Sequence, residues 1–144
     1  MRTKIKRFSF LDGLETFQAS GYHADFPLHS HDQICITLVT EGVECTQVGE
    51  SELIAPFQGI SLTYPEEIHA NPNRNDSSYS FLTFYISPEV VSYFNNDKVT
   101  YFKSRVIQDP WLYRSLVEFS RETDQTEAGF GSILKYLGQN HLTS

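Results

Sequence analysis

The first two thirds of the chain consist of short runs in which apolar and polar residues alternate, a pattern that favours β-strands over helices. Residues 5–11 and 14–19 form two such runs on either side of an Asp12-Gly13 pair, which predicts a hairpin. Further turn signals recur about every eight to twelve residues as far as the aromatic run 79–86. Such spacing is typical of a β-sandwich or a β-barrel.

A long extended run covers residues 26–39 and is followed by Glu41 and Gly42. This pair predicts a second hairpin, which would place Cys35 and Cys45 on adjacent strands. Two cysteines are too few for the disulfide framework of a secreted domain. We expect two buried free thiols, with a disulfide between them as the alternative.

After the aromatic run the pattern becomes helical. Ser87 and Pro88 predict the start of a short helix, because serine is a favoured N-cap and proline fits the first helical turn. Asp109 and Pro110 repeat this arrangement before a longer helix, and Thr126 caps a third. Strands followed by helices, without alternation of the two, indicate a mainly-β domain.

A chain of 144 residues has the size of one domain. We expect three parts: a basic N-terminal arm at 1–12, a barrel at 13–108 that includes a short helix near 88–95, and a helical hairpin at 109–141. No apolar run reaches the length of a membrane span. We therefore expect a cytoplasmic protein with no membrane partner.

The net charge of -7 argues against nucleic acid as a direct partner of this chain. Ten acidic residues and no lysine or arginine lie between Phe8 and Asn73. The resulting negative field favours a neutral or cationic ligand over an anionic one. The basic residues of the N-terminal segment are Arg2, Lys4, Lys6 and Arg7. They form either a solvated tail or an arm that folds over the acidic body.

The clearest candidate site is a row of polar side chains within the extended run. Side chains alternate between the two faces of a strand, so His29 and His31 point in the same direction. One face carries His29, His31, Gln33, Cys35 and Thr37, and the other carries Ile34, Ile36 and Leu38. In a barrel the polar face can line an interior pocket while the apolar face packs under helices. The opposite arrangement, with the polar face in contact with water, is also compatible with the pattern.

A second cluster ends in the sequence Tyr64-Pro65-Glu66-Glu67-Ile68-His69. Together with the earlier residues, it resembles the two motif regions of a cupin. The motifs are the H-x-H segment at 29–31, the Glu41-Gly42 turn, Gly59, Pro65 and His69. Over about residues 27–137, the chain is similar to the N-terminal sensor domain of AraC-type transcriptional regulators.

This resemblance implies a cupin-like jelly-roll barrel, followed by two to three C-terminal helices, that binds a small effector inside. The expected pocket residues are His29, His31, Gln33, Cys35, Thr37, Tyr64, His69 and Tyr85. Metal-binding cupins add a glutamate to three histidines, and here Cys35 occupies the glutamate position. We expect no cofactor, with zinc or nickel held by His29, His31, His69 and Cys35 as the alternative.

Sensor domains of this family commonly dimerise through their late helices. The apolar stripe that would form a homodimer interface contains Leu116, Phe119, Phe130, Ile133, Leu134 and Leu137. The alternative is that this stripe packs on the barrel of its own chain. DNA would be contacted only through a helix-turn-helix domain, which these 144 residues do not include.

Two functions from different classes follow. The first is a non-enzymatic domain that senses a small molecule and dimerises within an AraC-type transcription regulator. The second is a stand-alone, metal-dependent cupin enzyme, either an isomerase or an oxygenase. The absence of a carboxylate from the histidine row is the main argument against the enzyme.

Overall fold

The computed structural model of the chain describes residues 1–23, 26–72 and 77–143. Within these ranges the strands are β1 (Arg2–Arg7), β2 (Glu15–Tyr22), β3 (Phe26–His29), β4 (Ile34–Glu41), β5 (Glu44–Val48), β6 (Ser51–Ala55), β7 (Ile60–Thr63), β8 (His69–Asn71), β9 (Tyr79–Ile86), β10 (Tyr101–Phe102), β11 (Val106–Ile107) and β12 (Leu142–Thr143). The helices are α1 (Pro88–Tyr93), α2 (Pro110–Arg121) and α3 (Glu127–His141). The predicted mainly-β architecture with late helices is confirmed.

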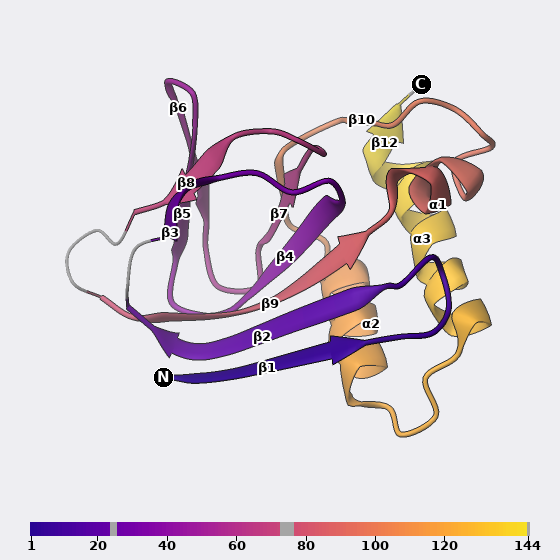
Figure 1. Cartoon of the computed structure of the whole chain (residues 1–144), viewed down its shortest axis with the longest axis horizontal. Coiled ribbons are helices and arrows are strands. Elements are labelled where there is room, and N and C mark those ends of the chain that lie inside the picture. Colours follow the sequence, from indigo (N-terminus) through magenta and orange to yellow (C-terminus); the bar gives the residue numbers. More distant parts are fainter. Residues whose placement is uncertain (24–25, 73–76, 144) are drawn as a thin grey trace.

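Two antiparallel sheets face each other and form the barrel (Figure 1). The larger sheet has the strand order β1-β2-β9-β4-β7-β11, and the smaller has the order β3-β8-β5-β6. In Figure 1 the smaller sheet lies on the left and the helices lie on the right. The short strands β10 and β12, which the sequence pattern does not predict, pair with each other and join the end of α3 to the segment after α1.

The predicted N-terminal hairpin is confirmed, since β1 pairs with β2 along its whole length. The connecting loop is wider than a two-residue turn because Leu11 and Leu14 point inward and are buried in the core. β1 lies at the edge of the larger sheet, with all six of its side chains exposed. The basic N-terminal segment is thus an edge strand, which corrects the expectation of a solvated tail or an arm over the barrel.

The predicted hairpin at Glu41 and Gly42 is wrong. β4 pairs with β7 and β9, whereas β5 pairs with β6 and β8, so the chain crosses here from the larger to the smaller sheet. Gly42 permits this crossing because its φ is +76° and a Cβ atom there would lie 2.9 Å from the carbonyl oxygen of Ser78. The crossing places Cys35 and Cys45 on different sheets. Both are free thiols as expected, but only Cys35 is buried, whereas Cys45 is partly exposed.

The helices begin where the sequence predicts. Two of the predicted N-caps make the expected hydrogen bonds: the Asp109 carboxylate accepts one from the backbone N–H of Leu112 at 3.1 Å, and the Thr126 hydroxyl accepts one from Gly129 at 3.0 Å. Within the part of the chain that the structure describes, no helix is long and apolar enough to cross a membrane.

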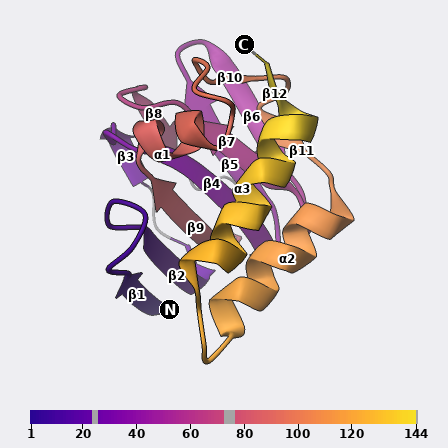
Figure 2. The same ribbon diagram turned by 90° about the vertical axis from the view of Figure 1, so that its right-hand side faces the viewer.

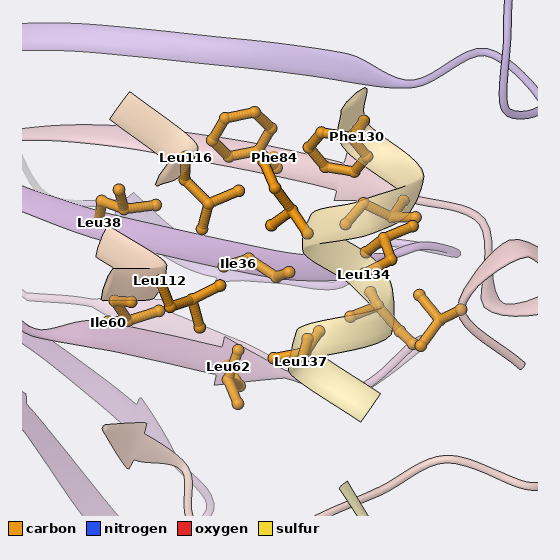
Figure 3. Packing of buried hydrophobic residues seen from close by; sticks show 14 of the residues in the cluster. Ile36, Leu38, Ile60, Leu62, Phe84, Leu112, Leu116, Phe130, Leu134 and Leu137 are labelled. Carbon is orange, nitrogen blue, oxygen red and sulfur yellow. The ribbon is translucent and has the colours of Figure 1, made fainter. Parts of the chain in front are cut away.

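Helices α2 and α3 lie across the outer face of the larger sheet (Figure 2). Figure 3 shows their leucine and phenylalanine side chains among those of β4, β7 and β9. Leu112, Leu116 and Phe130 have no exposed surface. Complete burial of such side chains contributes roughly 1.5–3 kcal/mol each to stability, so this layer is the main hydrophobic core.

The residues predicted for a dimer interface belong to this core. Each of them is at most 7% exposed: Leu116, Phe119, Phe130, Ile133, Leu134 and Leu137. A second chain cannot contact these side chains while the helices stay on the barrel. The predicted interface is therefore wrong, and the alternative, that the stripe packs on its own barrel, is correct.

Candidate functional site

A cavity of about 140 Å³ lies between the two sheets. The residues expected in the pocket that do line it are His29, His31, Cys35, Thr37, His69 and Tyr85. The apolar side chains that alternate with them on β4 face the core beneath the helices. The polar face of β4 therefore points into the barrel, which is the first of the two arrangements that the alternation allows.

Strand register arranges the cavity wall in layers. Cys35 on β4 pairs with Thr63 on β7. Two residues further along β4, Thr37 pairs with Ser61 and with Thr83, and the two threonine hydroxyls lie 2.8 Å apart. Because two residues of a strand span about 7 Å, a small molecule in the cavity can contact both layers at once.

Three histidines gather at the end of the cavity that is nearer to solvent. The possible ligand atoms of His29, His31 and His69 lie within 4.8 Å of one another. His29 faces His69 across the β3–β8 pair, with ring centroids 4.3 Å apart, and the ring of His31 lies 4.9 Å from that of His29. His69 is buried and the other two are half-buried.

The hydrogen bonds of these rings favour metal-binding tautomers. Nδ1 of His29 lies 2.6 Å from the carbonyl oxygen of Pro27, and Nδ1 of His69 lies 2.9 Å from that of Glu67. A carbonyl oxygen only accepts, so each Nδ1 carries a proton, and in the neutral ring the lone pair is then on Nε2. Burial lowers the pKa of His31 and His69, and the charge of the neighbouring His29 lowers it further. Both effects favour the neutral imidazole that binds a metal ion.

Cys35 is not part of this cluster. The described residues that converge as possible metal ligands are the three histidines alone. Burial raises the pKa of the Cys35 thiol to about 11, so the thiol stays protonated and is a poor metal ligand. The structure thus gives no support to Cys35 as a fourth ligand and places it in the cavity wall.

The structure does not bring Gln33 or Tyr64 into the cavity. The extended run breaks into β3 and β4, and Gln33 lies in the bend between them, where strand alternation does not apply. Tyr64 follows Thr63 directly and so points to the opposite side of the sheet. Its ring stacks on Phe102 with centroids 4.3 Å apart, and its hydroxyl accepts a hydrogen bond from the Phe102 backbone N–H at 2.9 Å.

The sequence reasoning missed a buried carboxyl group in the cavity. Glu44, the first residue of β5, is 5% exposed and accepts a hydrogen bond from the Ser61 hydroxyl at 2.6 Å. Burial raises its pKa to about 7, against the opposing effect of hydrogen bonds from Ser61 and Thr46. The sequence contains a pattern that could have identified it: Glu44 and Thr46 alternate along β5 and so share one face, just as the polar residues of β4 share the cavity face of β4.

One buried hydroxyl in the cavity wall is poorly satisfied. Among the described residues, Oγ1 of Thr63 has no oxygen or nitrogen partner, and only the weakly hydrogen-bonding thiol of Cys35 on the paired strand lies beside it. An unsatisfied buried polar group costs about 1–3 kcal/mol. A polar atom of a molecule bound in the cavity, or a water, can remove this cost.

Comparison with protein families identifies one that covers most of this chain. The family model of the AraC-like ligand binding domain matches residues 13–138. No curated protein matches the chain at a significant level.

Among solved structures, the chain is similar to a cupin superfamily protein from Desulfitobacterium hafniense, at 11% identity over 60% of this chain and 78% of that chain, with a TM-score of 0.45. It is similar to a Cupin 2 conserved barrel domain protein from Salinispora arenicola at 14% identity, 67% and 85% coverage and a TM-score of 0.47. It is also similar to the cupin domain of Cnp3 from Schizosaccharomyces pombe at 8% identity, 67% and 72% coverage and a TM-score of 0.48. At these values the solved structures say nothing about ligand or activity.

Proposed function

The chain belongs to the family of AraC-like ligand binding domains, and on this premise we propose that its barrel senses a small-molecule effector for a cytoplasmic transcription regulator. The effector occupies the cavity between the two sheets. A DNA-binding domain joined to this one makes the regulatory response. The chain itself catalyses no reaction in this proposal.

The cavity is the observation that carries the proposal. It lies between the two sheets, combines hydroxyl groups with aromatic rings, and includes the buried hydroxyl of Thr63, which has no oxygen or nitrogen partner among the described residues. Pockets that bind small molecules typically combine an aromatic or apolar lining with a few polar groups that fix the ligand's orientation.

β4 offers a direct route from the effector to the helices. Thr37 faces the cavity, whereas its neighbours Ile36 and Leu38 face the core that Leu112 and Leu116 share. A ligand that shifts β4 therefore acts on α2 through one thickness of the sheet. A homodimer would form through a surface other than the buried stripe. Ligand binding would change the populations of the conformations in which the two chains are arranged in that dimer.

A thermal-shift screen with small metabolites tests the proposal. A true effector raises the melting temperature, and its effect is weaker in Thr63→Val and Tyr85→Phe, which remove cavity hydroxyls at little change in volume. Ser132→Ala, which removes an exposed hydroxyl on α3, is the control and keeps the full effect. The proposal fails when no compound class gives a shift that the cavity variants reduce.

A metal centre is the second candidate, favoured by the convergence of three imidazoles with Nδ1 of two of them held by carbonyl groups. His29, His31 and His69 would hold the ion through nitrogen atoms. A bound ion would supply a Lewis acid at the solvent end of the cavity, as a metal-dependent enzyme requires. No carboxylate among the described residues joins this cluster, so the sensor remains the function that the geometry supports best.

A further inference from the structure

Glu44 is a buried acid, and no basic side chain of residues 1–23, 26–72 or 77–143 forms an ion pair with it. Its carboxyl group lies among hydroxyls, with Ser61 donating to Oε1 at 2.6 Å. No lysine or arginine lines the cavity among the described residues. A buried carboxylate that lacks a counter-charge is costly, so it is expected to have a positive partner or to stay protonated.

Glu44 and the histidines lie at different depths of the cavity. On β5, Gln47 pairs with Ala70, the residue after His69, whereas Glu44 lies three residues earlier. Three residues of a strand span about 10 Å, which separates Glu44 from the histidine cluster along the barrel. Glu44 is also much less exposed than the half-buried His29. The carboxyl group therefore lies apart from the two half-buried histidines, in a more buried part of the cavity.

Aromatic rings also line the cavity. The rings of Tyr79 and Phe81 are stacked with their centroids 5.2 Å apart, and Phe26 meets Phe81 edge to face with centroids 6.1 Å apart. Burial raises the pKa of Tyr79, and the nearby charge of Glu44 raises it further, in agreement with their proximity. Aromatic faces attract cations through the ring quadrupole, and a carboxylate beside them adds a full negative charge.

We propose that the effector is a compact ammonium compound whose positively charged nitrogen binds the Glu44 carboxylate in the wall of the cavity. This inference rests on the proposed function and names its ligand class. The ammonium group supplies a counter-charge that the described cavity residues do not provide, and it donates hydrogen bonds to the carboxylate and the adjacent hydroxyls. An engineered cavity of about 150 Å³ holds benzene, so a ligand of roughly six to ten non-hydrogen atoms fits.

Matched compounds of this size test the charge requirement. Benzylamine and cyclohexylamine are compared with benzyl alcohol and cyclohexanol, and with benzoate and cyclohexanecarboxylate, at about pH 8, where Glu44 with its pKa of about 7 is mostly ionised. The amines are expected to raise the melting temperature by roughly 8 °C at a free concentration a hundred times the Kd. The alcohols and carboxylates are expected to give a shift at least several-fold smaller.

Two variants locate the effect. Glu44→Gln keeps the size of the side chain and one accepting oxygen but removes the charge, and it is expected to weaken amine binding at least about tenfold because the charge-assisted hydrogen bond is lost. Glu50→Gln removes the same charge from the exposed turn between β5 and β6 and is expected to leave amine binding unchanged. Circular dichroism confirms that each variant is folded.

The outcomes separate this inference from the proposed function. Equal shifts from amines and alcohols, or undiminished amine binding in Glu44→Gln, overturn the ammonium inference. Binding of only neutral or anionic compounds overturns it as well but leaves the sensor function intact. Failure of every compound, here and in the metabolite screen, counts against both. If Glu44→Gln does not fold, the comparison of amines with alcohols on the unmodified chain still decides.

Discussion

Asp109 at the start of α2 contacts His141 at the end of α3, with Oδ2 of the carboxylate 2.7 Å from Nε2 of the imidazole. The same Oδ2 accepts a hydrogen bond from the Tyr136 hydroxyl at 2.7 Å, while Oδ1 caps α2. Although burial acts to raise the pKa of Asp109, the hydrogen bonds from His141 and Tyr136 hold it below its ordinary value. One carboxylate thus fixes how the two helices lie against each other.

Replacement of this carboxylate should loosen the helical layer. We predict that Asp109→Ala lowers the free energy of unfolding by about 2–3 kcal/mol, because it removes an N-cap and a charge-assisted hydrogen bond. Asp109→Asn keeps the cap and should lose less. Urea denaturation measures both, with the exposed Asp124→Ala as the control. Equal stability of Asp109→Ala and Asp124→Ala would contradict the role of the carboxylate.

Stability should fall as pH rises through the range in which Glu44 ionises. The carboxyl group has an ordinary pKa of 4.5 and a folded-state pKa of about 7, so between these values the folded protein holds the extra proton. The associated loss of stability is about 3 kcal/mol and is complete above the folded-state pKa. The lowered pKa values of His31 and His69 act in the opposite direction in every variant, so the Glu44 contribution is the difference between proteins. Urea denaturation at about pH 5 and pH 8 should show stability changing less favourably with rising pH in the wild type and in Glu50→Gln than in Glu44→Gln, by up to about 3 kcal/mol. A similar pH dependence in all three proteins would exclude Glu44 as its source.

A charge placed in the predicted dimer stripe should unfold the domain instead of separating two chains. We predict that Leu134→Glu costs more than about 4 kcal/mol, because it removes a buried side chain and introduces an unpaired charge into the core. Gln139→Glu adds the same charge to the exposed face of α3 and should be nearly neutral. Circular dichroism and urea denaturation separate the two. A folded, fully stable Leu134→Glu would place this side chain outside the core.

The metal-centre candidate predicts one zinc ion per chain. Added Zn²⁺ should raise the melting temperature of the wild type, and the effect should disappear in His69→Ala but persist in His23→Ala, which lies outside the cluster. Binding should weaken as pH falls, because protons compete for the imidazole nitrogens. Metal analysis of the purified protein and calorimetric titration give the stoichiometry. A zinc effect that survives His69→Ala would place the bound metal elsewhere.

Gly42 should tolerate substitution less well than another glycine with a similar backbone. Both Gly42 and Gly49 have positive φ, but only Gly42 would bring a Cβ atom within 2.9 Å of a backbone oxygen. We predict that Gly49→Ala costs about 1–2 kcal/mol from backbone strain alone and that Gly42→Ala costs clearly more. Thermal denaturation gives both values. Equal costs would show that the contact with Ser78 relaxes freely.

The periodic parts of the fold were the predictable ones. The alternation on β4 identifies both its cavity face and its core face, and the proline-linked N-caps locate α1 and α2. The crossing at Gly42 was not predicted because a glycine in a turn is compatible both with a hairpin and with a change of sheet. Only the pairing of strands distant in sequence distinguishes the two. Gln33 was misplaced for a related reason, since a short bend interrupts the alternation that was extended through it.

The remaining wrong predictions concern which side chains are buried and against what. From the sequence alone, Glu44 cannot be distinguished from the exposed acidic residues of the same segment. Only the three-dimensional structure shows that it is buried beside Ser61. The stripe on α2 and α3 has the same pattern whether it meets a second chain or its own barrel. Sequence periodicity gives the direction in which a side chain points, but the partner on that side follows from the tertiary fold.

The exposed edge strand β1 has consequences for the protein at high concentration. Two copies approaching edge to edge would bring together the cationic groups of Arg2, Lys4, Lys6 and Arg7, and their mutual repulsion opposes growth of one sheet into another. The basic residues thus limit aggregation at the open edge of the barrel. Because concentrated salt screens such repulsion, it should promote self-association at this edge before it affects the buried core.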